Sequence, residues 1–514
     1  MLRGDILDKA FYELQNGSDI RGIALEGVQG QRVNLTGERV KAISKAFAVW
    51  LSKRAGKDIT DLRISIGMDS RLSSPSIKKK ASEGLIDSGC NVYDFAMAST
   101  PAMFMSTVTD GYKYDGAVMI TASHLPYNRN GMKFFTLNGG LEKEEITAVL
   151  DIAASGEYKT SSKRGTVCDV DFMSVYSKLL VDKIRNNIKG VSDSMLPLKG
   201  FKIVVDAGNG AGGFFVEKVL KPLGADTSGS LFLDPDGRFP NHIPNPENSE
   251  AMGFIVRAVK EAKADLGIIF DADVDRAGAV TGSGIAINRN RLIAMMAAIV
   301  LKEHPNSIIV TDSVTSSGLK KFIEDLGGIH HRFKRGYKNV IDEGIRLNSI
   351  GKECYLAMET SGHGALKENY FLDDGAYLVT KILIAMANLK LKEGKNIETI
   401  IEKLKEPLEA EEFRLKISTD DFKEYGSKII SDLGAYVKTV SDWKVEPKNY
   451  EGIRVSIGDG DGWFLLRLSL HEPLMPLNIE SNSRGGVKAA ALKLLKFLEN
   501  YKSLDLAPIK DYLK

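Results

Sequence analysis

The chain has 514 residues and exceeds one hydrophobic core, because cores stop growing at roughly 250 to 300 residues; about three to five domains are expected. Its 69 Lys and Arg residues nearly cancel its 67 Asp and Glu residues, which argues against nucleic-acid binding and against attachment to an anionic membrane. Three widely spaced cysteines without a CxxC pair argue against a disulfide framework or a zinc site and predict a reducing compartment, either the cytoplasm or an organelle stroma after removal of a transit peptide.

Short β-branched runs recur along the chain, each ending in a small or acidic residue and a Gly/Ser-rich loop. Most are followed by a stretch with helical periodicity, and this alternation predicts βαβ units with parallel sheets. Ligands of such sheets gather beyond the carboxyl ends of the strands. The runs are 62–71, 116–124, 201–213, 266–276 and 307–317.

Breaks rich in Pro, Gly or charge divide the chain into four pieces; they lie near 186–200, 302–307 and 406–412. The first three pieces are expected to be α/β domains. The last has a hairpin pattern over 453–470 and an amphipathic helix over Gly486–Tyr501, so a smaller α+β domain is expected. The predicted domains are 1–192, 193–304, 305–410 and 411–514.

The first candidate site is the loop Thr121–Pro126, which begins within the run 116–124. A strand delivers Ser123 to the loop tip, His124 follows it, and Lys133 lies ten residues further on. A hydroxyl with an imidazole and an ammonium group near it suits a serine that carries a phosphoryl group. The alternative is a Ser-His turn that caps a helix.

The second candidate site directly follows the apolar strand LGIIF. Its three carboxylates alternate along the chain: Asp271, Asp273 and Asp275. Carboxylates in this pattern at a strand end can converge on one hard cation such as Mg2+. An EF-hand loop is excluded, because its sixth position would be Arg276 instead of Gly and its twelfth Gly282 instead of Glu. The alternative is a solvated acidic turn.

The third candidate site is Glu359–His363, after the apolar stretch CYLAM. Glu359 and Ser361 can accept and donate hydrogen bonds to neighbouring sugar hydroxyls, and His363 can act as an acid or a base. A turn with a helix cap gives much the same pattern, so this motif alone indicates little.

The fourth candidate site is Arg467–Pro473, in the last piece of the chain. Arg467 and Ser469, with the turn that follows them, can bind a phosphate group. The alternative is an ordinary strand end.

In this order, and along nearly the whole chain, the four sites resemble the α-D-phosphohexomutase family, which includes phosphoglucomutases, phosphomannomutases and phosphoglucosamine mutases. Three further segments resemble motifs of the same family: Gly17–Gly22 with its Arg21, Gly67–Arg71, and Lys334–Gly336. The resemblance implies three related α/β domains with mixed, largely parallel sheets and a smaller C-terminal α+β domain around one cleft.

The resemblance also implies an isomerase that acts as an intramolecular phosphotransferase. Phosphorylated Ser123 would donate to a hexose monophosphate, the bound hexose 1,6-bisphosphate would turn around, and its other phosphate would return to Ser123. Phosphate would thereby move between C1 and C6 of glucose, mannose or N-acetylglucosamine. Mg2+ is the expected cofactor. Hexose phosphate and hexose 1,6-bisphosphate are the expected partners of a monomer or homodimer.

The resemblance implies a role for each site residue. The residues expected to act in catalysis are Ser123, His124, Lys133, Arg21 and His363. Those expected to bind substrate are Arg71, Arg276, Lys334, Glu359, Ser361, Arg467 and Ser469. The expected metal ligands are Ser123, Asp271, Asp273 and Asp275.

The chain departs from the family pattern in the fourth motif. Leu470 and His471 replace the usual Gly/Asn and Thr, and Pro476 stands where another Arg often follows. The site for the distal phosphate would lose at least one charge-assisted donor, worth about 1.5 to 3 kcal/mol. Arg484 or His471 is the expected compensation. Two smaller departures occupy positions where the family usually has Gly: Met358 and Ala272.

Intact chemistry in the first two sites, with an altered fourth site, leaves three other functions open. One is a hexose 1,6-bisphosphate synthase such as a glucose 1,6-bisphosphate synthase, in which a sugar bisphosphate charges Ser123 and the product is released. Another is a phosphatase of the haloacid dehalogenase type, whose nucleophile motif Asp271–Val274 matches. The third is an inactive sugar-phosphate sensor, against which the retention of Ser123 and Lys133 argues.

Overall fold

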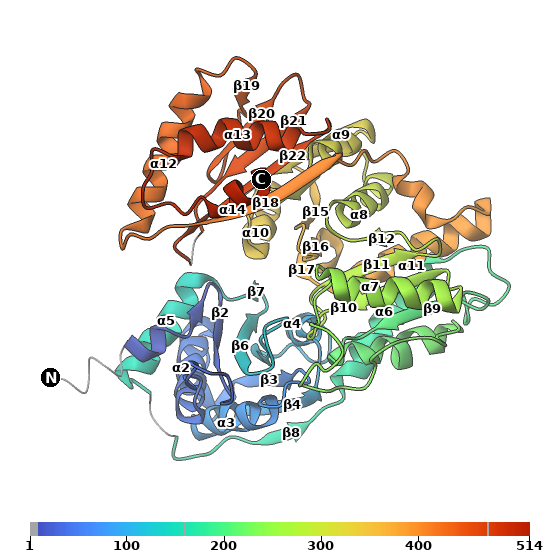
Figure 1. Cartoon of the computed structure of the whole chain (residues 1–514). Coiled ribbons are helices and arrows are strands. Elements are labelled where there is room, and N and C mark those ends of the chain that lie inside the picture. The colour runs from blue at the N-terminus through green and yellow to red at the C-terminus, as the bar shows by residue number, and fades with distance from the viewer. Residues whose placement is uncertain (1–8, 159–160, 470–471) are drawn as a thin grey trace. The chain divides into compact units, whose positions relative to one another are not determined.

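The computed structural model describes residues 9–158, 161–469 and 472–514 (Figure 1). These residues form two compact units. The first unit consists of 9–288, Ser361–Ala365 and Leu372–Thr399, and the second of Arg289–Thr360, Leu366–Phe371 and Ile400–Lys514. The chain therefore passes from one unit to the other five times along its length. None of the described helices is long and apolar enough to cross a membrane.

A mixed sheet forms the first part of unit 1, in the order β1-β2-β6-β5-β3-β4-β8 with β7 beside β6. Strands β3, β4, β5 and β8 are parallel, whereas β1, β2 and β6 are antiparallel to their neighbours. The strands are β1 (Gln15–Asn16), β2 (Asp19–Ile23), β3 (Arg63–Met68), β4 (Asn91–Met97), β5 (Gly116–Ile120), β6 (Arg129–Thr136), β7 (Gly139–Gly140) and β8 (Val167–Asp169).

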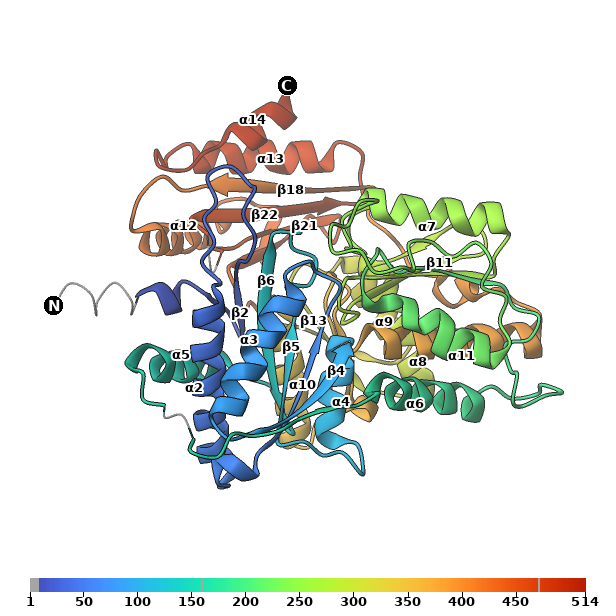
Figure 2. The same ribbon diagram turned by 90° about the horizontal axis from the view of Figure 1, so that it is seen from below.

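Helices cover both faces of this sheet (Figure 2). One face is packed against α2 (Gly37–Ala55), α3 (Ser74–Asp87) and α5 (Lys143–Ser155), and the other against α4 (Thr100–Val108). Side chains alternate between the two faces of a strand. On β6, Met132 and Phe134 join the hydrophobic core below α2. Lys133, between them, is therefore directed to the opposite face.

A second sheet of unit 1 has the order β12-β11-β10-β9, with β9 and β10 parallel and β10 and β11 antiparallel. Its strands are β9 (Ile203–Asp206), β10 (Leu266–Phe270), β11 (Ala277–Thr281) and β12 (Ala286–Ile287). The α-helices of this part are α6 (Phe172–Asn187), α7 (Ser249–Ala262) and α11 (Gly375–Glu393). A π-helix at Phe215–Leu220 lies between short 3-10 helices at Ala211–Gly213 and Lys221–Leu223. Because β10 and β11 are neighbours, the loop 271–276 between them is short and fixed at both ends.

In unit 2 a parallel sheet has β13 between β14 and β15. The elements are β13 (Ile308–Thr311), β14 (Ile329–Arg332), β15 (Cys354–Met358), α8 (Arg289–Glu303), α9 (Ser317–Asp325) and α10 (Tyr337–Ser349). The chain changes units within β16 (Gly364–Leu366) and returns to unit 1 with β17 (Leu372–Asp373). Parallel strands place their carboxyl ends at one edge, so the residues after β13, β14 and β15 are neighbours.

An antiparallel sheet in the order β18-β22-β21-β20-β19 forms the C-terminal part of unit 2. Helices α12 and α13 pack on this sheet (Figure 1). The elements are β18 (Glu409–Lys416), α12 (Phe422–Val437), β19 (Trp443–Val445), β20 (Ile453–Ile457), β21 (Gly462–Leu466), β22 (Leu474–Ser481), α13 (Gly486–Leu498) and α14 (Ala507–Leu513). Mixed sheets with parallel strands and a separate small C-terminal sheet confirm the predicted fold class.

Three details of the C-terminal part differ from the sequence-based expectation. The predicted break at 406–412 is wrong from Glu409 onwards, because β18 begins there as an edge strand whose exposed acidic side chains resemble a loop in composition. The hairpin strand expected to reach Leu470 ends at Leu466, and Leu470 itself lies outside the described residues. The last predicted helix ends at Leu498 instead of Tyr501.

The stability of the C-terminal sheet is expected to depend on pH through Glu480. Its carboxylate accepts the indole N–H of Trp463 at 2.6 Å, and burial raises the pKa of Glu480 from 4.5 to about 7. Between these two pKa values, Glu480 is protonated in the folded sheet and ionised in the unfolded chain. The free energy of unfolding is therefore greatest at acid pH and falls by about 3 kcal/mol as the pH rises through both pKa values. Amide exchange of β21 and β22 at pH 5 and pH 8 measures the difference.

Glu480→Gln should remove most of this dependence and make the sheet more stable at pH 8. The matched control is Glu411→Gln, on the exposed side of β18, which should keep the dependence of the unchanged protein. Equal pH dependence in Glu480→Gln and the unchanged protein would contradict the assignment.

Candidate active site

Ser123 stands in the loop that leaves the carboxyl end of β5. Its backbone has φ +51°, in the left-handed region, which costs a non-glycine residue about 1 to 3 kcal/mol. Its N–H donates to the Thr121 hydroxyl at 2.9 Å, and the residue is 2% exposed. Such strain persists only where the surrounding structure holds it, and it is concentrated at functional sites.

Arg71 holds this loop through backbone carbonyls. Its side chain has no exposed surface, and its Nε donates to Asp69 Oδ2 at 3.1 Å. Its terminal nitrogens donate to the carbonyl oxygens of four loop residues: Ser123, Leu125, Pro126 and Arg129. The structure thus differs from the expectation that Arg71 binds substrate, because the loop and Asp69 occupy its guanidinium.

The loop 271–276 brings Asp271 and Arg276 to Ser123. Arg276 donates to Asp271 through its backbone N–H at 3.2 Å and through Nε at 3.0 Å. The Ser123 hydroxyl donates to Asp271 Oδ2 at 3.0 Å, and a terminal nitrogen of Arg276 lies 3.2 Å from Ser123 Oγ. Val274, at the centre of the loop, has φ +67°, which is unusual for a β-branched residue. The first two predicted sites therefore form one site.

The three aspartates of this loop fit a divalent cation. They are buried, and one carboxylate oxygen of each lies within 4.8 Å of the others. Among the described residues, nothing donates a hydrogen bond to Asp273 Oδ1 or Asp275 Oδ1, which are both buried. Buried carboxylate oxygens without a donor are costly, whereas Mg2+ prefers such oxygen ligands. The donor set therefore matches the expected magnesium site.

Lys133 and Thr100 bind the other oxygens of this triad. Lys133 Nζ lies 2.5 Å from Asp275 Oδ2 and 3.1 Å from Asp273 Oδ2. The Thr100 hydroxyl donates to Asp273 Oδ2 at 2.5 Å, and its N–H donates to the Asp273 carbonyl at 2.8 Å. Sequence reasoning missed Thr100. The Ser-Thr-Pro string at 99–101 signals a helix start, but it does not reveal this long-range pairing.

The carboxyl groups of the triad differ in how readily they ionise. Burial, together with the charges of Asp275 and Asp273, raises the pKa of Asp271 well above its ordinary value. Burial acts in the same direction on Asp275, but the positive charges of Lys133, His363 and Arg276 hold the pKa of Asp275 well below its usual range. Of Asp271 and Asp275, the second therefore carries the negative charge more readily.

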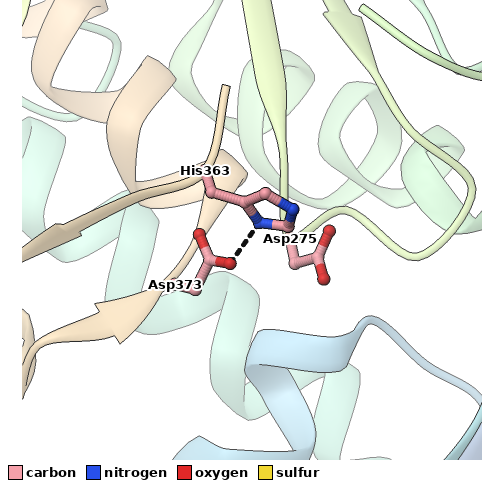
Figure 3. A group of neighbouring side chains, drawn as sticks. All are labelled: Asp275, His363 and Asp373. Carbon is pink, nitrogen blue, oxygen red and sulfur yellow. Dashed lines mark hydrogen bonds and ion pairs between the residues drawn. The ribbon is translucent and has the colours of Figure 1, made fainter. Parts of the chain in front are cut away.

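His363 lies between Asp373 and Asp275 (Figure 3). Its Nδ1 pairs with Asp373 Oδ2, and its backbone bridges to that of Arg276. Burial would lower the pKa of His363, but the charges of Asp373 and Asp275 raise it to about 9. An imidazole with this pKa is protonated at neutral pH and would have to lose its proton before it could ligate a metal ion. The aspartate triad is therefore the better metal site.

His124 and Arg21 complete the predicted catalytic set within unit 1. His124 Nδ1 lies 3.3 Å from Ser123 Oγ, and burial with the charges of Arg276, Arg21 and His363 lowers the pKa of His124 to about 2. The imidazole is therefore neutral at physiological pH. Arg21, on β2, pairs with Asp19 Oδ2 at 2.9 Å.

Polar residues gather at the strand ends of the parallel sheet in unit 2. Glu359 Oε1 accepts the N–H of Gly336 at 2.7 Å, and the Thr360 hydroxyl donates to Asp312 Oδ2 at 2.7 Å. Burial raises the pKa of Asp312 to about 7 against the charge of Arg335. Sequence reasoning recognised the strand before Asp312 but missed this residue as a member of the site.

The third motif is divided between the two units after Thr360. Glu359 belongs to unit 2, whereas Ser361 and His363 belong to unit 1. The remaining predicted residues lie in unit 2. Lys334 Nζ lies 5.6 Å from the centre of the Phe333 ring. Arg467 and Ser469 follow β21.

The departures from the family pattern have different structural consequences. Arg484 is wrong as a compensation, because it follows the far end of the β21–β22 pair, where Gly462 faces Ser481. Arg467 follows the other end, roughly 15 Å of strand away at about 3.4 Å per residue. His471, with Leu470, lies outside the described residues. The two residues at usual Gly positions are fully buried without a positive φ, so an L-residue fits at each: Ala272 and Met358.

Comparisons with known proteins agree with this site. Residues 13–160, 179–284 and 288–407 match the α/β/α domains I, II and III of the phosphoglucomutase/phosphomannomutase family. A phosphomannomutase/phosphoglucomutase of Pseudomonas syringae pv. tomato is 30% identical over 441 residues, which cover 85% of this chain and 88% of that protein. A phosphoglucomutase of Neisseria gonorrhoeae is 29% identical over 471 residues, covering 91% and 93%. The crystal structure of a phosphoglucomutase/phosphomannomutase family protein from Burkholderia thailandensis has a TM-score of 0.77 at 26% identity, covering 96% of this chain and 98% of that chain.

A serine on a strained loop, beside buried aspartates and cations in an α/β scaffold, defines an enzyme of phosphoryl transfer. It is an isomerase of the phosphohexomutase class, which transfers phosphate intramolecularly. The chain belongs to the phosphoglucomutase/phosphomannomutase family. The resemblance read from the sequence is thereby confirmed, and the synthase, phosphatase and sensor alternatives are not favoured.

Arg71→Met should destabilise the Ser123 loop. It would take this donor from four carbonyls and leave the buried Asp69 carboxylate without its counter-charge, at a cost of about 3 to 5 kcal/mol. The thermal midpoint and kcat should both fall. The matched control is Ser123→Ala, which removes only a hydroxyl and should melt within a few degrees of the unchanged protein. A rise in KM for Arg71→Met with no change in melting would instead support direct substrate binding.

Proposed function

We propose that the protein moves phosphate between C1 and C6 of a hexose phosphate through phosphorylated Ser123 and a bound hexose 1,6-bisphosphate. The observation that carries this proposal is the Ser123 hydroxyl, 3.0 Å from Asp271 Oδ2 and 3.2 Å from a terminal nitrogen of Arg276. An oxygen nucleophile held beside a cation and a metal-binding carboxylate suits reversible phosphoryl transfer.

In the first transfer a sugar hydroxyl attacks the phosphorus on Ser123, the new sugar O–P bond forms, and the bond to Ser123 Oγ breaks. Arg276, Lys133 and Arg21 supply positive charge where the phosphoryl group moves. The sugar hydroxyl loses its proton as it attacks, and Ser123 Oγ gains one as its bond to phosphorus breaks. We assign these two proton transfers to Lys133 and His363, because both lie against the loop 271–276. Neutral His124 orients Ser123 Oγ. The second transfer runs in reverse at the other end of the turned bisphosphate.

Mg2+ would be held by the phosphate on Ser123 and by the triad Asp271, Asp273 and Asp275. Magnesium offsets the negative charge on the phosphoryl oxygens when it is bound. Lys133 and Thr100 fix the carboxylates of Asp273 and Asp275 that would face the ion. Because these contacts come from β6 and α4, the donor set is arranged by the fold before any ion binds.

Unit 2 supplies groups suited to the sugar and to its second phosphate. We assign sugar hydroxyls to Glu359, together with Ser361 of unit 1, and the phosphate to Lys334, Arg467 and Ser469. The proposed partners are hexose phosphates and hexose 1,6-bisphosphate, bound by a monomer or homodimer. The proposed domain limits are 1–192, 193–304, 305–408 and 409–514; the boundary predicted between 410 and 411 moves to the start of β18 at Glu409.

A phosphatase that uses Asp271 as its nucleophile fits the geometry less well. Arg276 donates to both carboxylate oxygens of Asp271, and Ser123 donates to one of them. Neither oxygen is held ready for attack on phosphorus. Ser123 Oγ, in contrast, has a cation within hydrogen-bond distance.

Ser123→Ala should abolish mutase turnover, with kcat falling more than about 10³-fold, because no other group takes the phosphoryl from the substrate. Intact-mass spectrometry after incubation with glucose 1,6-bisphosphate should find one added phosphoryl group on the unchanged protein and none on the variant. The matched control is Ser73→Ala, a buried hydroxyl at the start of α3, which should keep the adduct. Turnover by a protein that never carries phosphate at position 123 would overturn the proposal.

Asp273→Asn should weaken Mg2+ binding by at least about tenfold, because it removes the charge of one ligand and keeps nearly the same shape. Calorimetric titration with Mg2+ measures this. Asp312→Asn is the control, since Asp312 is an equally buried carboxyl outside the triad. Unchanged Mg2+ affinity in Asp273→Asn would place the ion elsewhere.

A further inference from the structure

Three groups surround the guanidinium of Arg276. Its Nε donates to Asp271 Oδ2 at 3.0 Å, and one terminal nitrogen donates to Ser123 Oγ at 3.2 Å. The other terminal nitrogen donates to Asn245 Oδ1 at 3.4 Å. The side chain is only 2% exposed, so water has little access to replace any of these partners. Because a guanidinium is rigid and planar, acceptors on all three nitrogens fix its orientation.

Asn245 belongs to the loop 236–248, which precedes α7 and has no part in the mechanism described above. Its side-chain oxygen also accepts the Glu247 N–H at 3.0 Å. The residues on either side are prolines, Pro244 and Pro246, and both are buried. A proline fixes its own φ and also restricts the residue before it. The amide oxygen of Asn245 is therefore presented from a rigid segment.

A buried ion pair anchors this loop to the second sheet of unit 1. His242 Nε2 lies 3.0 Å from Oδ2 of Asp206, the last residue of β9, and neither side chain has exposed surface. His242 Nδ1 lies 2.8 Å from the Ile243 carbonyl oxygen. Burial lowers the pKa of His242, but the Asp206 carboxylate outweighs it and raises this pKa above its ordinary value. With oxygen acceptors at both ring nitrogens, the imidazole fixes the loop close to Asn245.

The same loop also contacts Arg71, which holds the Ser123 loop. The centre of the Phe239 ring lies 5.1 Å from Arg71 Cζ. Gly237 packs against the backbone of 70–72 with no room for a Cβ. One loop therefore contacts both of the arginines that donate to Ser123, one to its carbonyl and the other to its hydroxyl.

We propose that Asn245 is a positioning residue that orients Arg276 towards Ser123 Oγ during phosphoryl transfer. A guanidinium that could turn would keep its charge, but it would not hold a terminal nitrogen on the oxygen at which the P–O bond forms and breaks. Asn245 acts through Arg276 and does not touch the reacting atoms itself. The inference rests on the proposed mutase function and adds a residue that this function needs.

The first test compares Asn245→Leu and Asn245→Asp with the control Asn241→Leu. Leucine has nearly the size of asparagine and lacks the acceptor, so kcat should fall about tenfold with little change in KM for the hexose phosphate. Aspartate keeps an oxygen acceptor and should retain more of the kcat. Asn241 lies in the same loop, but its amide donates to Asn209 at 2.8 Å. Asn241→Leu should therefore match the unchanged protein.

The second test repeats Asn245→Leu in a protein that already carries Arg276→Lys. Rapid-quench sampling with intact-mass detection measures how fast glucose 1,6-bisphosphate phosphorylates Ser123. Asn245→Leu should slow this step about tenfold in the unchanged background. In the Arg276→Lys background it should have almost no further effect, because residues that act through one contact are not additive.

Equal effects of Asn245→Leu in the two backgrounds would reject the inference, since Asn245 would then act independently of Arg276. An unchanged kcat in Asn245→Leu would reject it too. A lowered melting temperature with full kcat regained on cooling would assign Asn245 a purely structural role. Should Asn245→Leu fold poorly, Asn245→Ala lacks the same acceptor without added bulk and makes both comparisons. Failure of the mutase proposal shows separately, as the absence of a phosphoryl adduct on Ser123 in the unchanged protein.

Discussion

Three buried carboxylates can share the loop 271–276 only because two cations pair with them. Lys133 comes from β6 and pairs with Asp273 and Asp275, while Arg276 turns back on Asp271. The alternation of β6 directs Lys133 away from the hydrophobic core and towards these carboxylates. Ion pairs therefore join the first sheet of unit 1, which carries Lys133, to the loop 271–276 of the second sheet. Without it, burial alone would favour the neutral acids and lose the metal-binding charge.

Charged side chains also fix the backbones of the two loops that we propose to contact the substrate. Arg71 holds the Ser123 loop through carbonyl oxygens, and Glu359 with Glu451 holds the Lys334–Gly336 loop through N–H groups. Each loop carries strained or exposed functional groups, yet its backbone is fixed by buried or partly buried charges. Preorganisation of this kind places reactive groups without requiring movement at the moment of reaction.

Much of this site could be predicted from the sequence because its residues follow strand ends, which can be recognised in a sequence. An apolar run followed by acidic or small residues located Ser123 and the aspartates. The missing members, Thr100, Asp312 and Glu451, act through pairings across 48 to 173 positions, which no local motif reveals. Arg71 was assigned to substrate because a guanidinium near a phosphate motif suits either role. Its burial, which only tertiary structure reveals, favours the role of holding the loop.

The division of the chain into two interleaved units constrains how the protein is made. Unit 1 is not complete until Thr399 has left the ribosome, because α11 and the His363 segment belong to it. Domains generally fold as units during synthesis, but here the nascent amino-terminal half must wait for residues encoded much later. No single cut separates the units, so a truncated gene product would expose the apolar surface that α11 covers and become a substrate for chaperones or proteolysis.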